Sequence, residues 1–335
     1  MSITLDSKIN FIKNFLKENN YTYLELNDSQ IDYVYNLYKN GIITETEDGQ
    51  ILNYYGLYFN LKKSYDQMKI YYLMAIDKGN EIAMNSLGCY YQDIEKNYDL
   101  MKKYYLMAID KGNQKAMNSL GYYYNHSEKN YDLMKKYYLM GIDKGDTSPM
   151  INLGYYYNHI EKNYELTKKY YLMAIEKNEK NSLLAMKLLA RYYKEIEKNY
   201  DLMKKYFLMA IEKDDERAMN DLGYYYQYEE KNYELMMKYY LMAIDKGDSF
   251  TPNNLACYYK NVEKNYDLMK KYYLMAIEKN NNNAMKNLGN YYETIEKNYV
   301  LMKKYYLKYI SKNKNLNNQE IDKIKKKINY KEKED

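Results

Sequence analysis

The segment Asn97–Gly112, NYDLMKKYYLMAIDKG, decides how most of the chain folds, because close copies of it recur along the sequence. The tyrosine after its first asparagine recurs as Tyr65, Tyr98, Tyr131, Tyr164, Tyr200, Tyr233, Tyr266 and Tyr299. Neighbouring copies are 33 residues apart, except for one interval of 36. A fixed period of this length is typical of solenoids, in which stacked helical hairpins share a continuous core. The sequence therefore predicts eight repeats.

The quoted segment carries the start and stop signals of an α-helix. The first residue of the segment, Asn97, is a good N-cap, and Asp99 lies near the positive end of the helix dipole. The last residue, Gly112, follows the predicted helix, and glycine tolerates the left-handed conformation of a C-terminal cap. The sequence predicts such a cap in all eight copies, at Gly79, Gly112, Gly145, Asn178, Asp214, Gly247, Asn280 and Asn313.

A shorter helix precedes each of these segments, as in residues 83–92. Ala83, Leu87 and Tyr91 follow i, i+4, i+8 spacing, which predicts one apolar face. A small residue stands beside the leucine position in every copy, at Gly56, Gly88, Gly121, Gly154, Ala190, Gly223, Ala256 and Gly289. Glycine inside a helix costs about 1 kcal/mol relative to alanine, so its recurrence predicts a close approach between two helices.

The combined pattern A-x-x-x-L-G-x-x-Y and Y-Y-x-x-A-I-x-x-G resembles the Sel1-like repeat, a branch of the tetratricopeptide superfamily. The resemblance covers residues 51–313. It implies an all-α fold, a right-handed α-solenoid of about eight helix hairpins with helical end caps. The 33-residue unit is shorter than usual for the family and has a shortened turn between its helices. We expect these departures to change the pitch of the superhelix and not the fold.

The segments on either side of the repeats predict helices that cover the ends of the solenoid. Residues 1–50 contain two helical patterns, at 7–18 and 29–40, and are expected to form an N-terminal helical cap or a small accessory region. Residues 314–335 are expected to form a basic C-terminal helix or tail. Its isoleucines, Ile321, Ile324 and Ile328, have helical spacing.

Composition narrows the classes of function. The net charge is +5, and the last 28 residues hold nine lysines against five acids, so the body is nearly neutral. This balance disfavours a nucleic-acid partner. The sequence has no apolar run long enough for a membrane span and no signal-type N-terminus. Cys89 and Cys257 lie five repeats apart, which predicts free thiols and a cytoplasmic protein.

The sequence offers no recognisable catalytic constellation. His126 and His159 are the only histidines, and both are predicted to lie in surface turns away from the two cysteines. They lack the recurring Cys or acidic partners of a zinc site, and no glycine-rich phosphate-binding motif is present. We therefore expect a protein that is not an enzyme and carries no cofactor or metal.

Two rows on the first helices are the candidate contacts with a partner. An asparagine two residues before the leucine position recurs at Asn53, Asn85, Asn118, Asn220 and Asn253, and forms a ladder that could bond to an extended peptide. Ile151, Lys187 and Lys286 interrupt it. One turn further on, the residue varies most among copies, and Tyr122, Tyr155, Arg191 and Tyr224 are its candidate anchors. Drift on an unused surface would give the same variation.

Three functions follow from these observations. The resemblance implies a protein-binding scaffold or adaptor that holds a peptide or helix of an unidentified partner in its concave groove. The alternative is a helical-repeat protein that binds single-stranded RNA, with the asparagines bonding to bases and the tyrosines stacking on them. A third is a structural role through self-association, although we expect a monomer or weak self-association.

Overall fold

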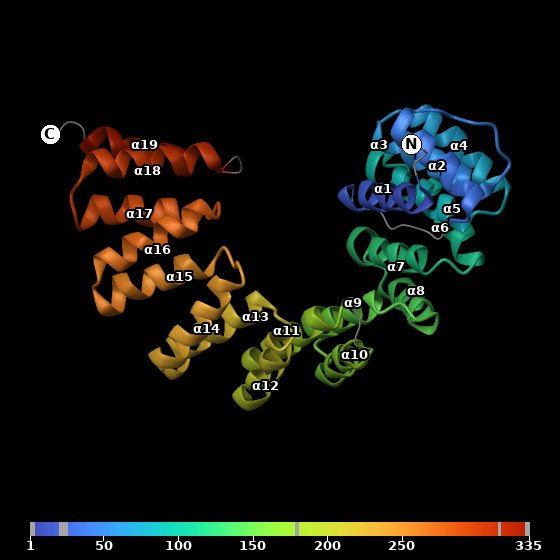
Figure 1. Cartoon of the computed structure of the whole chain (residues 1–335). Helices are drawn as coiled ribbons and strands as arrows, with labels where there is room; N and C mark the ends of the chain where they lie inside the picture. Colours follow the sequence, from blue (N-terminus) through green and yellow to red (C-terminus); the bar gives the residue numbers. More distant parts are fainter. Residues whose placement is uncertain (1–3, 20–25, 178–180, 314–315, 332–335) are drawn as a thin grey trace. The chain divides into compact units, whose positions relative to one another are not determined.

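The computed structural model describes residues 4–19, 26–177, 181–313 and 316–331, and these residues form helices and turns without any strand (Figure 1). The chain divides into two compact units, Met1–Ala174 and Ile175–Asp335. An all-α solenoid of helix hairpins was predicted, and it is confirmed. No helix among the described residues combines the length and the apolar character needed to cross a membrane.

Eight hairpins follow one another along the chain. In the first unit the helices are α1 (Leu5–Glu18), α2 (Asp28–Asn40), α3 (Gly49–Leu61), α4 (Tyr65–Asp77), α5 (Glu81–Tyr90), α6 (Tyr98–Asp110), α7 (Gln114–Tyr123), α8 (Tyr131–Asp143) and α9 (Ser148–Tyr156). Helix α10 (Tyr164–Glu176) ends just beyond the first unit. The second unit continues with α11 (Ser182–Tyr192), α12 (Tyr200–Ile211), α13 (Glu216–Tyr225), α14 (Tyr233–Asp245), α15 (Thr251–Tyr258), α16 (Tyr266–Glu278), α17 (Asn282–Thr294), α18 (Tyr299–Lys312) and α19 (Asn318–Lys331).

The predicted caps define the second helix of each hairpin. Seven asparagine side chains accept the backbone N–H three residues on, and they are Asn97, Asn130, Asn163, Asn199, Asn232, Asn265 and Asn298. Six of the predicted left-handed C-terminal residues have positive φ, namely Gly79, Gly112, Gly145, Asp214, Gly247 and Asn280. Asn178 lies outside the described residues.

The prediction for Asn313 was wrong. Its φ is −107°, because α18 runs on to Lys312 and is one residue longer than α6. Asn313 is therefore itself the C-cap, whereas Gly112 stands one residue beyond the C-cap Lys111 and takes the left-handed conformation.

The first helices end differently from the prediction. Helix α5 continues as a π-helical turn over Tyr91–Glu95, and Lys96 then adopts a left-handed conformation with φ of 56°. The Asn97 N–H donates to the Tyr91 carbonyl at 2.9 Å and closes the turn. Six hairpins share the π turn, at Tyr91–Glu95, Tyr124–Glu128, Tyr157–Glu161, Tyr193–Glu197, Tyr226–Glu230 and Tyr259–Glu263. This compact turn replaces the glycine-containing turn usual for the family.

In six of the eight hairpins, a glycine of the first helix receives a tyrosine ring from the second helix. A Cβ atom added to Gly121 would lie 2.6 Å from Cδ1 of Tyr138, and one added to Gly88 would lie 2.5 Å from Cδ1 of Tyr105. Both rings are almost fully buried. The predicted close approach of two helices is confirmed, and it is an approach of a tyrosine ring to a helix backbone.

Consecutive hairpins are joined by a second set of tyrosines and by ion pairs. Lys135 of α8 contacts Glu161 of the next hairpin at 2.8 Å and lies over the ring of Tyr156, 5.2 Å from its centroid. The ring of Tyr131 packs against that of Tyr156 at 5.1 Å. In the preceding pair of hairpins, the hydrogen bond from Lys102 lowers the pKa of Glu128. Ion pairs of this kind fix five hairpins to the next one at the outer turn, namely Lys69 with Glu95, Lys102 with Glu128, Lys135 with Glu161, Lys204 with Glu230 and Lys270 with Glu296.

Helices outside the repeats cover both ends. In the first unit, Ile12 and Leu16 of α1 are buried in a cluster with residues of α2 and Tyr54 of α3. In the second unit, Ile324 and Ile328 of α19 are buried against the last hairpin. These contacts agree with a capping role, and the domain boundaries predicted from the sequence remain predictions.

Replacing Gly121 with alanine should destabilise the protein. Alanine normally favours a helix, but here its Cβ would meet the buried ring of Tyr138, and overpacking of this kind costs about 1–3 kcal/mol. Chemical denaturation of both proteins gives the difference in unfolding free energy.

Gly141→Ala is the matched control. Gly141 occupies the position of Ala108 and Ala174 in neighbouring repeats, and the closest contact of an added Cβ would be Pro149 at 3.2 Å, compared with 2.6 Å for the contact at Gly121, so the loss of stability should be clearly smaller. Equal stability of the Gly121→Ala variant and the wild-type protein would show that the close packing is not a constraint.

Candidate functional site

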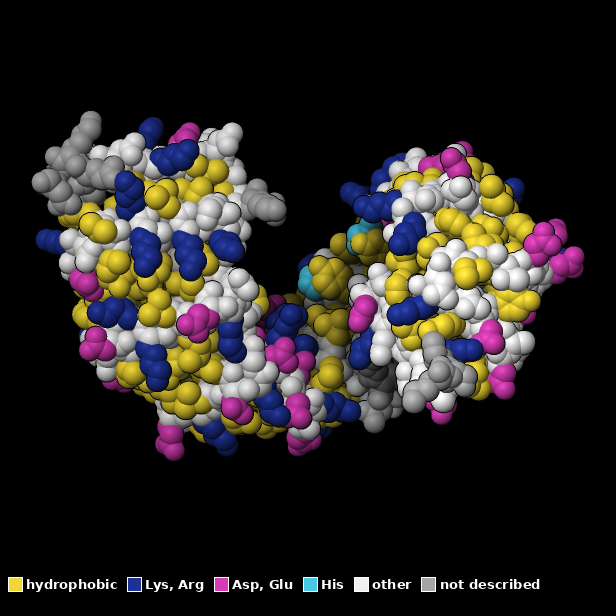
Figure 2. All heavy atoms as spheres, turned by 45° about the horizontal axis from the view of Figure 1, so that its top comes forward, with side chains coloured by type: hydrophobic (Ala, Val, Ile, Leu, Met, Phe, Trp, Pro, Cys, Tyr) yellow, Lys and Arg dark blue, Asp and Glu magenta, His cyan; other side chains and the backbone are white. Residues whose placement is uncertain are grey.

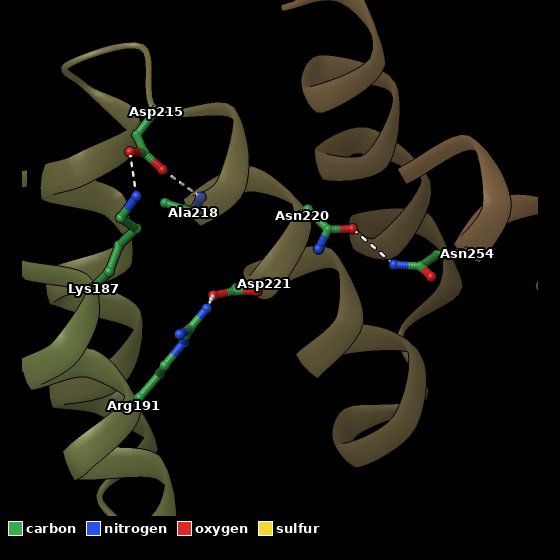
Figure 3. A network of polar contacts seen from close by, with 7 residues as sticks. All are labelled: Lys187, Arg191, Asp215, Ala218, Asn220, Asp221 and Asn254. Carbon is green, nitrogen blue, oxygen red and sulfur yellow. Dashed lines mark hydrogen bonds and ion pairs between the residues drawn. The ribbon is translucent and has the colours of Figure 1, made fainter. Parts of the chain in front are cut away.

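The asparagine row links the first helices to one another. Asn118 of α7 accepts a hydrogen bond from the side chain of Asn152 of α9 at 3.1 Å. In the second unit, Asn254 donates to Asn220 at 2.9 Å (Figure 3), and Asn287 donates to Asn253 at 3.0 Å. Each pair joins two residues 34 apart in the sequence. These amide oxygens are therefore used between repeats, and contact of the same residues with a partner remains a prediction.

Charged residues form the links where lysine interrupts the row. Lys187 contacts Asp215 at 2.7 Å, and both side chains are largely buried. Asp215 also accepts the backbone N–H of Ala218 and so caps α13 (Figure 3). At the end of the row, Lys286 contacts Glu320 of α19 at 2.7 Å, again across 34 residues. Helix α19 therefore offers its polar partner at the same spacing as a further repeat.

The row lacks these links at its beginning. The Oδ1 atoms of Asn53 and Asn85 are buried and have no hydrogen-bond partner. The residues at the linking position of the next hairpin are Ser86 and Ser119, whose side chains are shorter than that of asparagine. A pocket of about 500 Å³ lies here, lined by residues of α3, α5 and the start of α7.

The second row presents exposed aromatic rings in pairs. Tyr122 is 48% exposed and stacks on His126, with 3.9 Å between ring centroids. Tyr155 is 50% exposed and stacks on His159 at 4.0 Å. Both histidines, cyan in Figure 2, also bond through Nδ1 to the carbonyl of the tyrosine they stack on. Sequence reasoning treated the histidines as turn residues and missed that they hold these rings.

The remaining predicted contacts in this row lie in the second unit. Tyr224 packs against Tyr228 at 4.4 Å, and Lys194 lies over its ring. The Arg191 guanidinium contacts Asp221 at 2.7 Å and remains half-exposed (Figure 3). The structure brings Tyr122 and Tyr155 onto adjacent helices of the first unit, because the bond between Asn118 and Asn152 joins α7 and α9.

Two positions of this row are occupied by cysteines, Cys89 and Cys257, and each lies beside a tyrosine hydroxyl. Both are free thiols, and Cys89 accepts a hydrogen bond from the Tyr105 hydroxyl at 3.3 Å. Cys257 lies at the same distance from the Tyr273 hydroxyl. Burial raises the pKa of both thiols, which favours the unreactive protonated form. Among the residues that the structure describes, His, Cys, Asp and Glu form no group of three or more suited to a metal ion.

The bond between Asn118 and Asn152 should contribute measurably to stability. Asn152→Ala leaves a half-buried acceptor without its donor, which costs about 1–3 kcal/mol. A double-mutant cycle with Asn118→Ala should give a coupling energy of about 0.5–1.5 kcal/mol. Chemical denaturation of the four proteins measures it.

The equivalent cycle on Asn85 and Ser119 is the control, because no bond joins that pair. Its coupling energy should be close to zero. Equal coupling in the two cycles would contradict the assignment of the asparagine pairs as links between repeats.

Comparison with known proteins identifies the fold. No protein-family model matches the sequence, and no curated protein matches it. Among solved structures, the protective antigen c5321 of uropathogenic Escherichia coli, which displays an SLR fold, is 20% identical with a TM-score of 0.53. That similarity covers 93% of this chain and 70% of the antigen. A Sel1 repeat protein from Oxalobacter formigenes is 21% identical, with a TM-score of 0.47 over 65% of this chain and 99% of that chain. This chain therefore has the SLR fold of the c5321 antigen.

Proposed function

We propose that this protein is a non-catalytic scaffold that binds a segment of another protein along the face formed by its first helices. The observation that carries the proposal is the pair of exposed aromatic stacks on α7 and α9, Tyr122 on His126 and Tyr155 on His159. Large rings that stand half-exposed and are held in one orientation are the usual anchors of protein interfaces.

The rigidity of these rings favours binding. A free tyrosine loses rotamer freedom when a partner covers it, and this loss weakens association. Stacking on histidine and the histidine bond to the tyrosine carbonyl restrict each ring before a partner arrives. Adjacent packed helices are about 8–10 Å apart, so two rings on neighbouring helices can contact successive side chains of one bound segment.

A protein partner fits the charges better than RNA does. Several lysines of the second helices are paired with glutamates of the next hairpin, as in Lys135 with Glu161 and Lys204 with Glu230. These lysines are partly neutralised, and the chain outside its last 28 residues, residues 1–307, carries a net charge of only +1, which gives little net attraction for a phosphate backbone. Single-stranded RNA that stacks on the exposed tyrosines remains the alternative function.

The cellular setting is part of the proposal. Two unpaired cysteines suit a reducing compartment, which supports the cytoplasm as the place where this scaffold works. The end helices α1 and α19 bury apolar side chains against the terminal hairpins, which supports a monomer or weak self-association. No cofactor is needed for binding of this kind.

Affinity capture from cell lysate with Tyr122→Ala/Tyr155→Ala tests the proposal. The wild-type protein should recover a protein partner, and the variant should lose at least nine-tenths of it, because hot-spot residues of this type contribute about 2 kcal/mol or more each. Quantitative mass spectrometry of both captures measures the difference.

Leu106→Ala/Leu139→Ala is the matched control. These leucines are exposed to a similar degree on the second helices α6 and α8, so their loss should leave recovery unchanged. Equal loss in both variants would contradict binding on the first-helix face. Recovery of RNA alone, released by salt, would establish the alternative function.

A further inference from the structure

The first two asparagines of the row differ from the others in one respect. Asn118, Asn220 and Asn253 each receive an N–H from a carboxamide of the next hairpin. The corresponding oxygens of Asn53 and Asn85 receive none, although they are buried. A buried acceptor without a donor carries a desolvation penalty, and native structures rarely retain one without a reason.

The missing donor has a cause in the sequence. At the linking position, asparagine is present as Asn152, Asn254 and Asn287, whereas the second and third hairpins have Ser86 and Ser119. Serine lacks the carboxamide that reaches the acceptor in the other repeats. The replacement therefore removes the donor and leaves space at the same point.

A pocket lies beside Asn53 and Asn85, and Ser86 is part of its lining. Its volume is about 500 Å³, and its lining includes Asn53, Asn85, Ser86, Glu81 and Lys115. It lies entirely within the first unit. The side-chain amide rotates about a soft terminal torsion, so a modest rotation of Asn85 can turn its oxygen toward the pocket.

We propose that this pocket binds the carboxamide side chain of a glutamine or asparagine in the bound partner segment. The chain itself shows the chemistry that fits, because a carboxamide donates to the equivalent oxygen in three other repeats. The partner would supply the link that the serines omit. This inference rests on the proposed function, since it names the side chain that the binding face selects.

Peptide titration of the full-length protein tests the selection. Three acetylated and amidated tripeptides, Gly-Gln-Gly, Gly-Glu-Gly and Gly-Met-Gly, are added up to about 20 mM, and the asparagine side-chain signals are followed by NMR. Glutamate has the shape of glutamine but no side-chain N–H, and methionine controls for charge. The glutamine peptide should bind at least tenfold more tightly than either control.

Two variants decide whether the pocket is responsible. Ser86→Asn/Ser119→Asn supplies the internal carboxamide, so it should abolish the preference for glutamine while Tm stays equal or rises. Ser86→Ala/Ser119→Ala leaves the pocket open and should retain the preference. Equal affinities for the three peptides, no binding at about 20 mM, or a preference that survives the asparagine variant would each overturn the inference.

The result is separable from that of the capture experiment. A partner that depends on Tyr122 and Tyr155 but ignores the asparagine variant would leave the proposed function standing without the carboxamide pocket. A glutamine preference in a protein that recovers no partner would retain the pocket and reject the scaffold function.

Discussion

The structure depends on a contact that recurs in six of the eight hairpins, between a tyrosine ring of the second helix and the backbone of the first helix at its glycine. Tyr105, Tyr138 and Tyr240 are among the largest fully buried side chains, and each lies where a Cβ on the facing glycine would collide with it. The ring can reach the backbone only because the glycine has no side chain. This contact sets the distance between the two helices of a hairpin and fixes both within the core.

This packing constraint distinguishes positions whose residue type is nearly constant among the repeats from positions whose residue type varies. Packing positions are filled by tyrosine, alanine, leucine and methionine with little change from copy to copy, whereas exposed positions of the first helices differ. The contacts between the first helices pair amides with amides, as in Asn220 with Asn254, and lysines with acids, as in Lys187 with the N-cap Asp215 of the next first helix. The pocket beside Asn85 lies where serine replaces the asparagine that donates to this row in other repeats.

The periodicity of the sequence was enough to predict the hairpins, the asparagine caps and the close approach at Gly88, because each depends on local chemistry repeated in every copy. The π turn with Lys96 in a left-handed conformation could not be predicted, since lysine has no preference for that conformation. The prediction for Asn313 failed because the residue type shows only that a left-handed cap is tolerated at that position, and not that the chain adopts one there. At the candidate site, variation among the copies of the repeat was enough to predict that Tyr122 is exposed. Its stack on His126 depends on the geometry of the turn, which the sequence did not reveal.

The high tyrosine content, 51 residues with no tryptophan, has a structural explanation beyond codon usage. Rings of Tyr91 and Tyr104 stack within a hairpin at 5.5 Å, and rings of Tyr98 and Tyr123 meet between hairpins at 5.4 Å. Hydroxyl groups at the edges of these contacts bond to glutamates, as Tyr90 does to Glu95. Tyrosine therefore supplies both the core area and the polar ends that the turns need.

In the six hairpins with glycine at this position, the ring–glycine contact and the neighbouring hairpins together hold the two helices in place. Hydrogen exchange followed by mass spectrometry on a Tyr240→Ala variant tests this most directly, since loss of a buried aromatic side chain costs about 3–5 kcal/mol. The account predicts lost protection in α13 and α14 that fades over the adjacent hairpins, with α3 to α6 unchanged. An equal loss of protection along the whole chain, or none in α13 and α14, would contradict it.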